Sequence, residues 1–213
     1  GEKYIEMDLS QTLDWDSLDA EEQRYRARQM AVFAGMAEAM DESIGRVIDH
    51  LRSSGELDNT LIIFMSDNGA ESTVLTEVAP WFYRLRYDRE LEALGSRGSW
   101  SEYGRGWGYA SNTPFYSYKG SPYGGGLRVP MIVRHPALIE PGQRTPAFGY
   151  VMDIAPTLLE LTGTPVPDGE YQGRPVHRIM GTSMLPLLRG ESDRVHPEDE
   201  VLVYELAGGV AVW

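Results

Sequence analysis

The stretch TLIIFMSDNGAE, residues 60–71, decides the fold class, because a run of apolar residues leads directly into an oxygen-rich turn. Residues 61–65 are apolar without polar alternation, which predicts a strand covered on both faces, as in a parallel sheet between layers of helices. In open α/β sheets, ligands bind beyond the carboxyl ends of the strands. Ser66, Asp67 and Asn68 occupy that position and are therefore candidates for a site. Taken alone, they also fit an ordinary turn.

The segment before this strand predicts one long amphipathic helix over residues 20–53. Asp19 and Glu22 fit a capping box at its start, and Gly55 offers the left-handed conformation that often ends a helix. Apolar residues recur along it at steps of three and four: Met30, Phe33, Met36, Met40, Ile44, Val47, Ile48 and Leu51.

Two later segments extend the alternation of helix and strand. VPMIVR, residues 129–134, predicts a second buried strand, and DIAPTLLELTG, residues 153–163, predicts a helix. We expect Asp153 to cap this helix and Gly163 to end it. The pattern as a whole predicts an α/β fold.

The last part of the chain differs in composition. Residues 164–200 are rich in proline, glycine and charge, which predicts an irregular connection to a last strand at 201–206. We therefore expect a domain boundary near residue 165. Because the chain starts without methionine and ends just after an apolar strand, we expect it to be a piece of a longer protein.

Charge and composition exclude several classes of partner. The chain has 19 Lys and Arg against 32 Asp and Glu, a net charge of -13, which repels the phosphate backbone of nucleic acids. We find no apolar run of the roughly 20 residues that a membrane helix needs, so we expect neither nucleic acid nor membrane as a partner. With 0 Cys there is no thiolate chemistry in this stretch, and the cellular compartment stays undecided.

Residues 81–123 contain more than half of the aromatic residues of the chain, too many for a plain linker. Trp107 and Tyr109, with neighbouring rings, are candidates for the wall of a substrate pocket. The alternative is ordinary burial in a core. Arginines interleave with these rings, a pattern that can stack single-stranded bases, but the acidic total argues against that.

A second polar segment, YKGSPYGGGLRVP, residues 118–130, combines a lysine with three consecutive glycines. Glycines beside a strand predict backbone packed closely against another segment, and Lys119 offers a point charge suited to an anionic oxygen. The alternatives are a flexible bend and an ordinary surface lysine.

Taken together, LDNTLIIFMSDNGAE, YASNTPFYSYKGSPYGGGLRVPMIVRHP and VMDIAPTLLELTG resemble, in order and spacing, the type I sulfatases, which are arylsulfatase-like members of the alkaline phosphatase superfamily. The resemblance spans roughly residues 25–165. It implies a mixed sheet between helices followed by the start of a small antiparallel C-terminal subdomain. Residues 1–165 would be the C-terminal part of the catalytic α/β domain, and residues 166–213 a connection and an incomplete subdomain.

The resemblance also implies roles for single residues. Asp67 and Asn68 match the residues that bind a calcium ion, which holds the sulfate ester, and Lys119 matches the lysine that contacts the sulfate oxygens. Arg128 matches no catalytic residue and is expected to anchor its loop. Gly124 departs from the glutamate or glutamine of many members, which leaves the bonding of this loop open.

The nucleophile of the family, the hydrate of a formylglycine made within a Cys/Ser-x-Pro-x-Arg motif, is not encoded in these 213 residues. We expect it upstream, together with the carboxylates that complete the calcium site, a second lysine and the catalytic histidines. The four histidines of the chain match none of these and are expected to be surface or structural residues: His50, His135, His177 and His196.

The resemblance therefore implies a calcium-dependent sulfuric ester hydrolase that acts on a small-molecule or glycan sulfate ester. For this activity the chain would need the missing N-terminal half. Two alternatives remain. One is a phosphate or phosphonate monoester hydrolase of the same superfamily, because both anions are tetrahedral. The other is a catalytically silent fragment or binding module.

Overall fold

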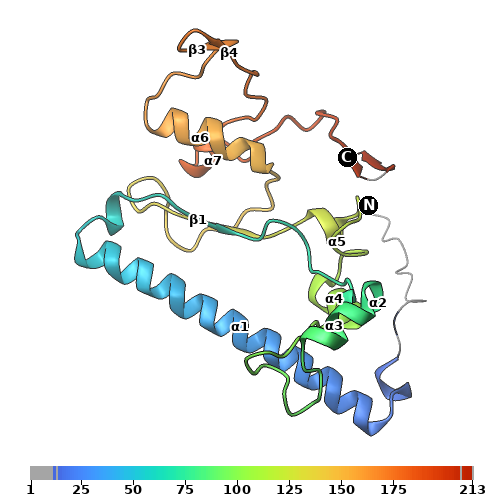
Figure 1. Cartoon of the computed structure of the whole chain (residues 1–213). Coiled ribbons are helices and arrows are strands. Elements are labelled where there is room, and N and C mark those ends of the chain that lie inside the picture. The colour runs from blue at the N-terminus through green and yellow to red at the C-terminus, as the bar shows by residue number, and fades with distance from the viewer. Residues whose placement is uncertain (1–11, 13, 207, 213) are drawn as a thin grey trace. The chain divides into compact units, whose positions relative to one another are not determined.

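The structure is a computed structural model that describes residues 12, 14–206 and 208–212. It is a mixed α/β structure (Figure 1) whose chain divides into two compact units. The first unit contains the described residues of 1–55, 64–132 and 203–213, and the second contains 56–63 and 133–202. The expected boundary near residue 165 is not tested by this division and stays a prediction.

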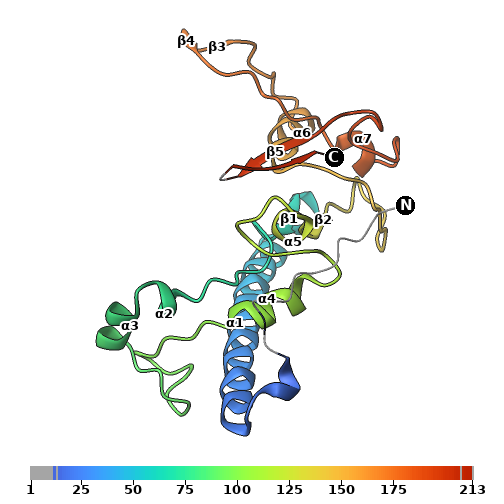
Figure 2. The same ribbon diagram turned by 90° about the vertical axis from the view of Figure 1, so that its right-hand side faces the viewer.

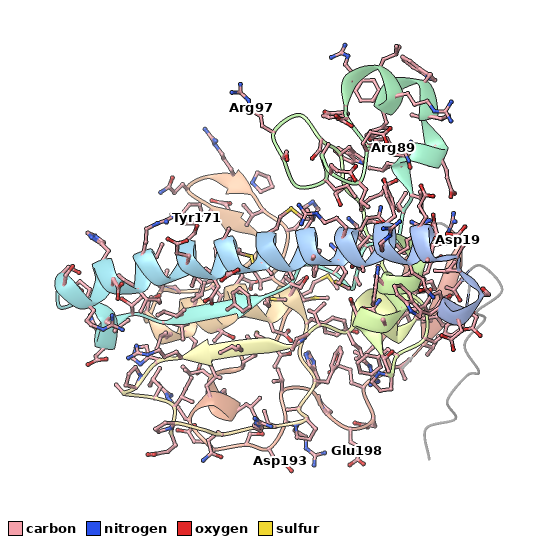
Figure 3. The ribbon with its side chains drawn as sticks, turned by 90° about the horizontal axis from the view of Figure 1, so that it is seen from below. Asp19, Arg89, Arg97, Tyr171, Asp193 and Glu198 are labelled. Carbon is pink, nitrogen blue, oxygen red and sulfur yellow. The ribbon has the colours of Figure 1, made fainter. Side chains whose placement is uncertain are left out.

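The first unit is built on one long helix, α1 (Ala20–Ser53), which follows the 3-10 turn η1 (Trp15–Ser17). Asp19 caps α1 as predicted, since its Oδ1 accepts hydrogen bonds from the backbone N–H groups of Glu21 and Glu22 at 2.9 and 2.8 Å. Figure 3 shows Asp19 at this end of the helix. The Glu22 carboxylate does not complete the capping box; it accepts from Arg26 Nε at 2.8 Å. Gly55, with φ +78°, follows the helix end as predicted.

Short elements complete the first unit: α2 (Leu75–Val78), α3 (Pro80–Arg86), α4 (Gly104–Asn112), α5 (Gly124–Leu127), β5 (Val203–Leu206) and β6 (Gly209–Val212). Helix α4 lies beside α1 in both views (Figure 1 and Figure 2). The Trp107 indole donates to the carbonyl oxygen of Arg26 at 3.0 Å, and the Arg28 guanidinium donates to the carbonyl oxygen of the buried Leu94 at 2.9 Å. Side-chain hydrogen bonds therefore hold α4 and the segment around Leu94 against α1.

The second unit also consists of short elements: η2 (Leu57–Asn59), η3 (Val151–Asp153), α6 (Ile154–Leu161), β3 (Glu170–Tyr171), β4 (Arg174–Pro175) and α7 (Leu185–Leu188). Its core forms where α6 meets α7, because Met184 and Leu185 are buried and the Met184 N–H donates to Thr157 Oγ1 at 2.8 Å. Gly163, with φ +66°, lies just beyond the end of α6 as predicted.

Asp153 has a different role from the predicted helix cap. Its side chain makes no capping bond to α6, because the turn η3 already continues into that helix. The carboxylate is fully buried and instead accepts from the N–H groups of Tyr150 and Thr182, at 2.6 and 2.8 Å, and from His196 Nε2 at 2.7 Å. Asp153 therefore joins three chain segments within the second unit.

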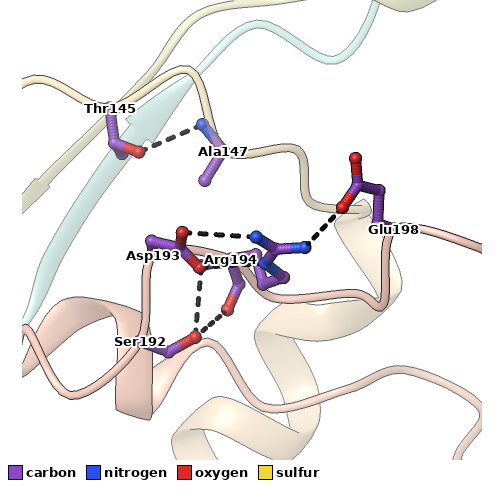
Figure 4. Close-up of polar contacts among 6 residues, drawn as sticks. All are labelled: Thr145, Ala147, Ser192, Asp193, Arg194 and Glu198. Atoms are coloured by element: carbon purple, nitrogen blue, oxygen red, sulfur yellow. Dashed lines mark hydrogen bonds and ion pairs between the residues drawn. The ribbon is translucent and has the colours of Figure 1, made fainter.

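The surface of the second unit also carries charged pairs (Figure 4). Arg194 donates to Asp193 at 2.9 Å and to Glu198 at 3.2 Å. These bonds raise the pKa of Arg194 and lower that of Asp193. Because the three side chains are exposed, we expect the pairs to add little to stability.

The expected buried strand is present as β1 (Ile62–Met65), and the expected second strand as β2 (Met131–Arg134). The two are neighbours in a two-stranded sheet. The prediction that these strands are buried on both faces was wrong for the described residues, since Phe64 is 43% exposed and Ile132 is 64% exposed. The reason is that β1 and β2 have only each other as neighbours in the described part of the chain.

The last expected strand is present as β5, which pairs with β6 in antiparallel fashion, as β3 does with β4. The expectation of small antiparallel sheets toward the C-terminus is confirmed. None of the helices in the described part of the chain combines the length and apolar character that crossing a membrane requires.

Candidate active site at the end of the first strand

The loop directly after β1 carries the two predicted metal ligands. Ser66 Oγ donates to the carbonyl oxygen of Asn68 at 2.8 Å, which closes the turn. Asp67 is exposed, and within the described residues its carboxylate makes no hydrogen bond or ion pair. Its oxygens are therefore available to a cation, while the turn itself is fixed by other groups.

The glycine segment packs directly against this loop. The Gly69 N–H donates to the Gly126 carbonyl oxygen at 3.1 Å. A Cβ added to Gly69 would lie 1.7 Å from the Gly125 carbonyl oxygen, and one added to Gly125 would lie 2.0 Å from the Ser117 carbonyl oxygen. The prediction that these glycines permit close backbone contact is confirmed, and the alternative of a flexible bend is not supported.

A set of hydrogen bonds places Lys119 beside the same loop. The Lys119 N–H donates to the Ala70 carbonyl oxygen at 3.1 Å. Asn112 bridges the two segments, because its Oδ1 accepts from the Ala70 N–H at 3.0 Å and its Nδ2 donates to the Ser117 carbonyl oxygen at 3.1 Å. Sequence reasoning missed Asn112, which lies at the end of α4, 42 residues from Ala70.

The side chain of Lys119 forms an ion pair with Glu71 at 3.1 Å. Glu71 Oε1 also accepts from the Thr73 N–H at 2.7 Å. Burial works against ionisation of Glu71, but the bonds from Thr73 and the ammonium of Lys119 outweigh it and hold the pKa of Glu71 below its ordinary value. The lysine is therefore oriented by a carboxylate that sequence reasoning did not select, although Glu71 ends the opening stretch.

The two pocket candidates lie within the first unit. Trp107 packs against Trp15, with ring centroids 5.7 Å apart. Tyr109 is buried, and its ring contacts that of Tyr118 edge-on at 5.1 Å. Both arrangements are typical of packing within a core, and a role for either residue in a substrate pocket stays a prediction.

The loop around Gly124 is closed by aromatic contacts. A Cβ at Gly124 would lie 3.3 Å from the Phe115 ring. The Arg128 guanidinium lies over the same ring, 5.4 Å from its centroid. Arg128 thus contacts the loop that it was expected to anchor.

The described residues do not form a complete metal site. No group of three or more His, Cys, Asp or Glu side chains in that part of the chain could hold a metal ion. Calcium takes about six to eight oxygen ligands, and Asp67 and Asn68 offer a carboxylate and an amide oxygen. The donor chemistry fits calcium, but the shell needs oxygens from other residues.

The histidines lie away from this loop in sequence and show structural roles where the structure gives them contacts. The His196 side chain is 8% exposed and bonds both Asp153 and Glu200, at 2.7 and 3.0 Å. His50 lies in the last turn of α1. His135 follows β2, and its Nδ1 is buried without a hydrogen-bond partner among the described groups.

The fold thus defines a mixed α/β protein with an oxygen-rich strand end and a lysine fixed beside it. A comparison with family models matches the sulfatase family over residues 7–164. The chain therefore belongs to the sulfatase family.

Individual relatives agree with this assignment. An uncharacterized sulfatase of Schizosaccharomyces pombe is 42% identical over 94% of this chain and 37% of its own length. The arylsulfatase of Klebsiella aerogenes is 32% identical over 85% of this chain and 38% of its own length. The chain thus spans less than two fifths of the length of either relative.

A solved structure shows the same fold. The crystal structure of Ps i-CgsB in complex with k-i-k-neocarrahexaose superposes with a TM-score of 0.56 and 26% sequence identity. The similarity covers 84% of this chain and 31% of the other.

Proposed function

We propose that this chain supplies the strand-end loop and one catalytic lysine of a calcium-dependent, arylsulfatase-like sulfuric ester hydrolase. The observation that carries the proposal is the placement of Lys119 beside the Asp67–Asn68 loop. Backbone bonds, the Asn112 bridge and the Glu71 ion pair all support that placement. The names of relatives in the sulfatase family support the same reaction class.

The residues of this chain act on the charge of the ester. The Lys119 ammonium contacts the sulfate oxygens and neutralises the negative charge that grows on them as the ester breaks. Asp67 and Asn68 supply two oxygen ligands for calcium. Calcium, when bound, would hold the sulfate group and withdraw charge from its oxygens.

The nucleophile belongs to another part of the protein in this proposal. Neither Cys-x-Pro-x-Arg nor Ser-x-Pro-x-Arg occurs in the chain, and the relatives are much longer than the chain. We expect a formylglycine upstream, whose hydrate would supply the nucleophilic oxygen. The 213-residue chain alone should therefore show no turnover.

The substrate class is a sulfate ester of a small molecule or glycan. Relatives named as an arylsulfatase, as steryl-sulfatases and as a choline-sulfatase differ widely in the alcohol that their names contain. The sulfate group is what these names share. The proposal therefore assigns the residues around Lys119 to the sulfate group rather than to one alcohol.

The test is to assay the longer parent protein with an aryl sulfate and the matching aryl phosphate. We expect sulfate hydrolysis, and a loss on the order of 10²-fold in rate in Lys119→Ala, by analogy with the loss of an oxyanion donor. The matched control is Arg105→Ala, which removes an ion-paired cation of the same unit, 3.2 Å from Glu77, and should keep full activity.

Other outcomes select the alternatives. A preference for the phosphate ester would favour a phosphate or phosphonate monoester hydrolase. Absence of turnover of both esters by the parent would favour a silent fragment or binding module. Full activity in Lys119→Ala would remove the role of the lysine.

A further inference from the structure

Glu71 and Lys119 form a pair of opposite charges at the edge of the candidate active site. Glu71 Oε2 lies 3.1 Å from Lys119 Nζ, and the Lys119 and Glu71 side chains are 46% and 45% exposed. Burial alone would raise the pKa of Glu71, but hydrogen bonds from Thr73 and the Lys119 ammonium lower it below its ordinary value. The carboxylate is therefore ionised at neutral pH and opposes the charge of the lysine that the ester would contact.

The Glu71 carboxylate is held in place by groups other than Lys119. Its Oε1 accepts from the Thr73 N–H at 2.7 Å. The next residue, Ser72, is buried against α4, where a Cβ added to Gly108 would lie 2.9 Å from the Ser72 Cβ. Since an ammonium group has three donors, Lys119 can bond Glu71 and an ester oxygen at the same time.

An ester bound to Lys119 would lie close to the charge of Glu71. An oxygen that accepts from a charged N–H lies about 2.8 Å from the nitrogen, and Glu71 Oε2 lies 3.1 Å from the same nitrogen. The ester oxygen is then at most about 6 Å from the carboxylate oxygen. This distance depends only on residues within one unit.

Sulfate and phosphate monoesters present nearly the same tetrahedral shape to this lysine but differ in charge. A sulfate monoester is singly charged. A phosphate monoester carries about 1.5 to 2 negative charges at pH 7, because its second pKa is about 6. Shape therefore separates the two esters poorly, whereas a fixed carboxylate repels the phosphate ester more strongly.

Coulomb's law gives the size of this repulsion. One extra negative charge about 6 Å from a carboxylate is disfavoured about 3-fold in bulk water and about 100-fold at an effective dielectric constant of about 20. Because Glu71 and Lys119 are nearly half exposed, water screens part of the repulsion. We therefore expect an effect of about 10-fold at low ionic strength.

We propose that Glu71 is a specificity-determining residue, which makes the site prefer sulfate esters to phosphate esters. This role rests on the proposed function. Glu71 acts through its charge: it pairs with Lys119 and repels the second negative charge of a phosphate ester. The other charges around the ester stay the same when Glu71 alone is replaced, so its contribution can be measured by itself.

The first test compares phenyl sulfate and phenyl phosphate as substrates of the longer parent protein at pH 8. Glu71→Gln removes the charge but keeps an oxygen for the Thr73 N–H, whereas Glu71→Asp keeps the charge. Glu77→Gln is the matched control, because Glu77 pairs with Arg105 at 3.2 Å rather than with Lys119. Thermal unfolding followed by circular dichroism verifies that each variant is folded.

We expect Glu71→Gln to raise kcat/KM for phenyl phosphate relative to phenyl sulfate about 10-fold. In 1 M NaCl the change should shrink to about 2-fold or less, because the Debye length falls to about 3 Å. Glu71→Asp and Glu77→Gln should stay within about 2-fold of the wild-type ratio. A merely structural role of Glu71 would change the rates of both esters together and would not respond to salt.

The second test measures binding and needs no turnover. Benzenesulfonate is singly charged and phenylphosphonate is close to doubly charged at pH 8, and neither contains the ester bond that hydrolysis breaks. Isothermal titration calorimetry on the parent measures the affinity for both. We expect Glu71→Gln to strengthen phenylphosphonate binding about 10-fold relative to benzenesulfonate binding, and Glu77→Gln to leave the two affinities unchanged.

The outcomes separate this inference from the proposed function. If the parent hydrolyses phenyl sulfate and Glu71→Gln leaves both preferences unchanged, the inference is overturned and the proposed function stands. An equal shift in Glu77→Gln or in Glu71→Asp would also overturn the inference, since the effect would then not follow the charge beside Lys119. No hydrolysis of either ester would defeat the proposed function, and an unchanged binding preference in Glu71→Gln would then defeat the inference as well.

Discussion

At the scale of single residues, Gly69 shows how the strand-end loop depends on the absence of a side chain. Its ideal Cβ position lies 1.7 Å from the Gly125 carbonyl oxygen, a backbone atom that cannot rotate away. We expect Gly69→Ala to lower the free energy of unfolding by about 1–3 kcal/mol or more, the cost of overpacking. Urea unfolding followed by circular dichroism measures it.

Gly106→Ala is the control for that substitution. Gly106 lies within α4, and its Cβ position has no atom within 4 Å. Alanine there should stabilise the helix by roughly 0.5–1 kcal/mol, because glycine loses more backbone entropy in a helix. Equal stability of the two variants would contradict the close packing of the loop.

His196 makes the stability of the second unit depend on pH. Burial alone would lower the pKa of His196, but hydrogen bonds and charge from Asp153 and Glu200 raise it above its ordinary value. The stabilisation is therefore fully present below about pH 6.5, the unfolded pKa, and is lost as the pH rises through the folded pKa. We expect wild type to unfold more easily at pH 8 than at pH 6.

The matching variant is His196→Gln. Its free energy of unfolding at pH 6 should be lower than that of wild type by roughly 1.5–3 kcal/mol, the usual contribution of a hydrogen bond to a charged group. Its stability should also change much less between pH 6 and pH 8. The control His50→Gln, at an exposed position in α1, should keep the wild-type pH dependence. If the stability of His196→Gln changed with pH as much as that of wild type, His196 would not be the group that makes stability depend on pH.

The residues of the site divide into those with a local sequence signal and those without one. Asp67, Asn68 and Lys119 could be selected because they lie in recognisable segments after a strand and before a glycine turn. Asn112 and Glu71 could not, because their importance comes from bonds to groups 42 and 48 residues away in the chain. Asp153 was assigned as a cap because two of its partners, Thr182 and His196, lie 29 and 43 residues away in the chain.

At the scale of secondary-structure elements, α1 could be predicted because its signals are local: a capping aspartate, apolar residues at helical spacing and a terminal glycine. Helix α4, with the sequence GRGWGYASN, has three glycines and no side-chain cap at its start. Its contact with α1 through Trp107 supplies the stability that its sequence lacks. Helices of this kind are not predictable from sequence alone.

The cap of α1 gives a prediction at this scale. Asp19→Ala removes the acceptor of two N–H groups of the first turn, so we expect a loss of about 1 kcal/mol in the free energy of unfolding. Chemical unfolding, followed by circular dichroism at a wavelength of 222 nm, measures this loss. Ser43→Ala, in the exposed middle of the helix, should change stability by a few tenths of a kcal/mol at most. An equal effect at both positions would argue against the capping role.

At the scale of the whole molecule, the chain has apolar surface that its own described residues leave open. Met36, Met40 and Val47 on α1 are each more than half exposed, as is Ile132 of β2. The apolar pattern of residues 61–65 predicts a covered strand, but it does not tell which part of a longer protein covers it. Since the chain spans only 37% and 38% of two relatives, the composition of the sheet could not be derived from the local pattern.

The same division between this chain and the rest of a longer protein governs calcium binding. Asp67 and Asn68 contribute two oxygens of a shell that needs about six to eight, and within the described residues no cluster of acidic or histidine side chains adds more. We expect calorimetry to detect calcium binding by the parent and only weak binding by the 213-residue chain.

In the parent, Asp67→Ala should weaken calcium binding at least about 10-fold, or about 1.4 kcal/mol. Asp41→Ala, an exposed position on α1, should have no effect. Tight binding by the chain alone would show that upstream carboxylates are unnecessary, and unchanged affinity in Asp67→Ala would move the calcium site away from this loop.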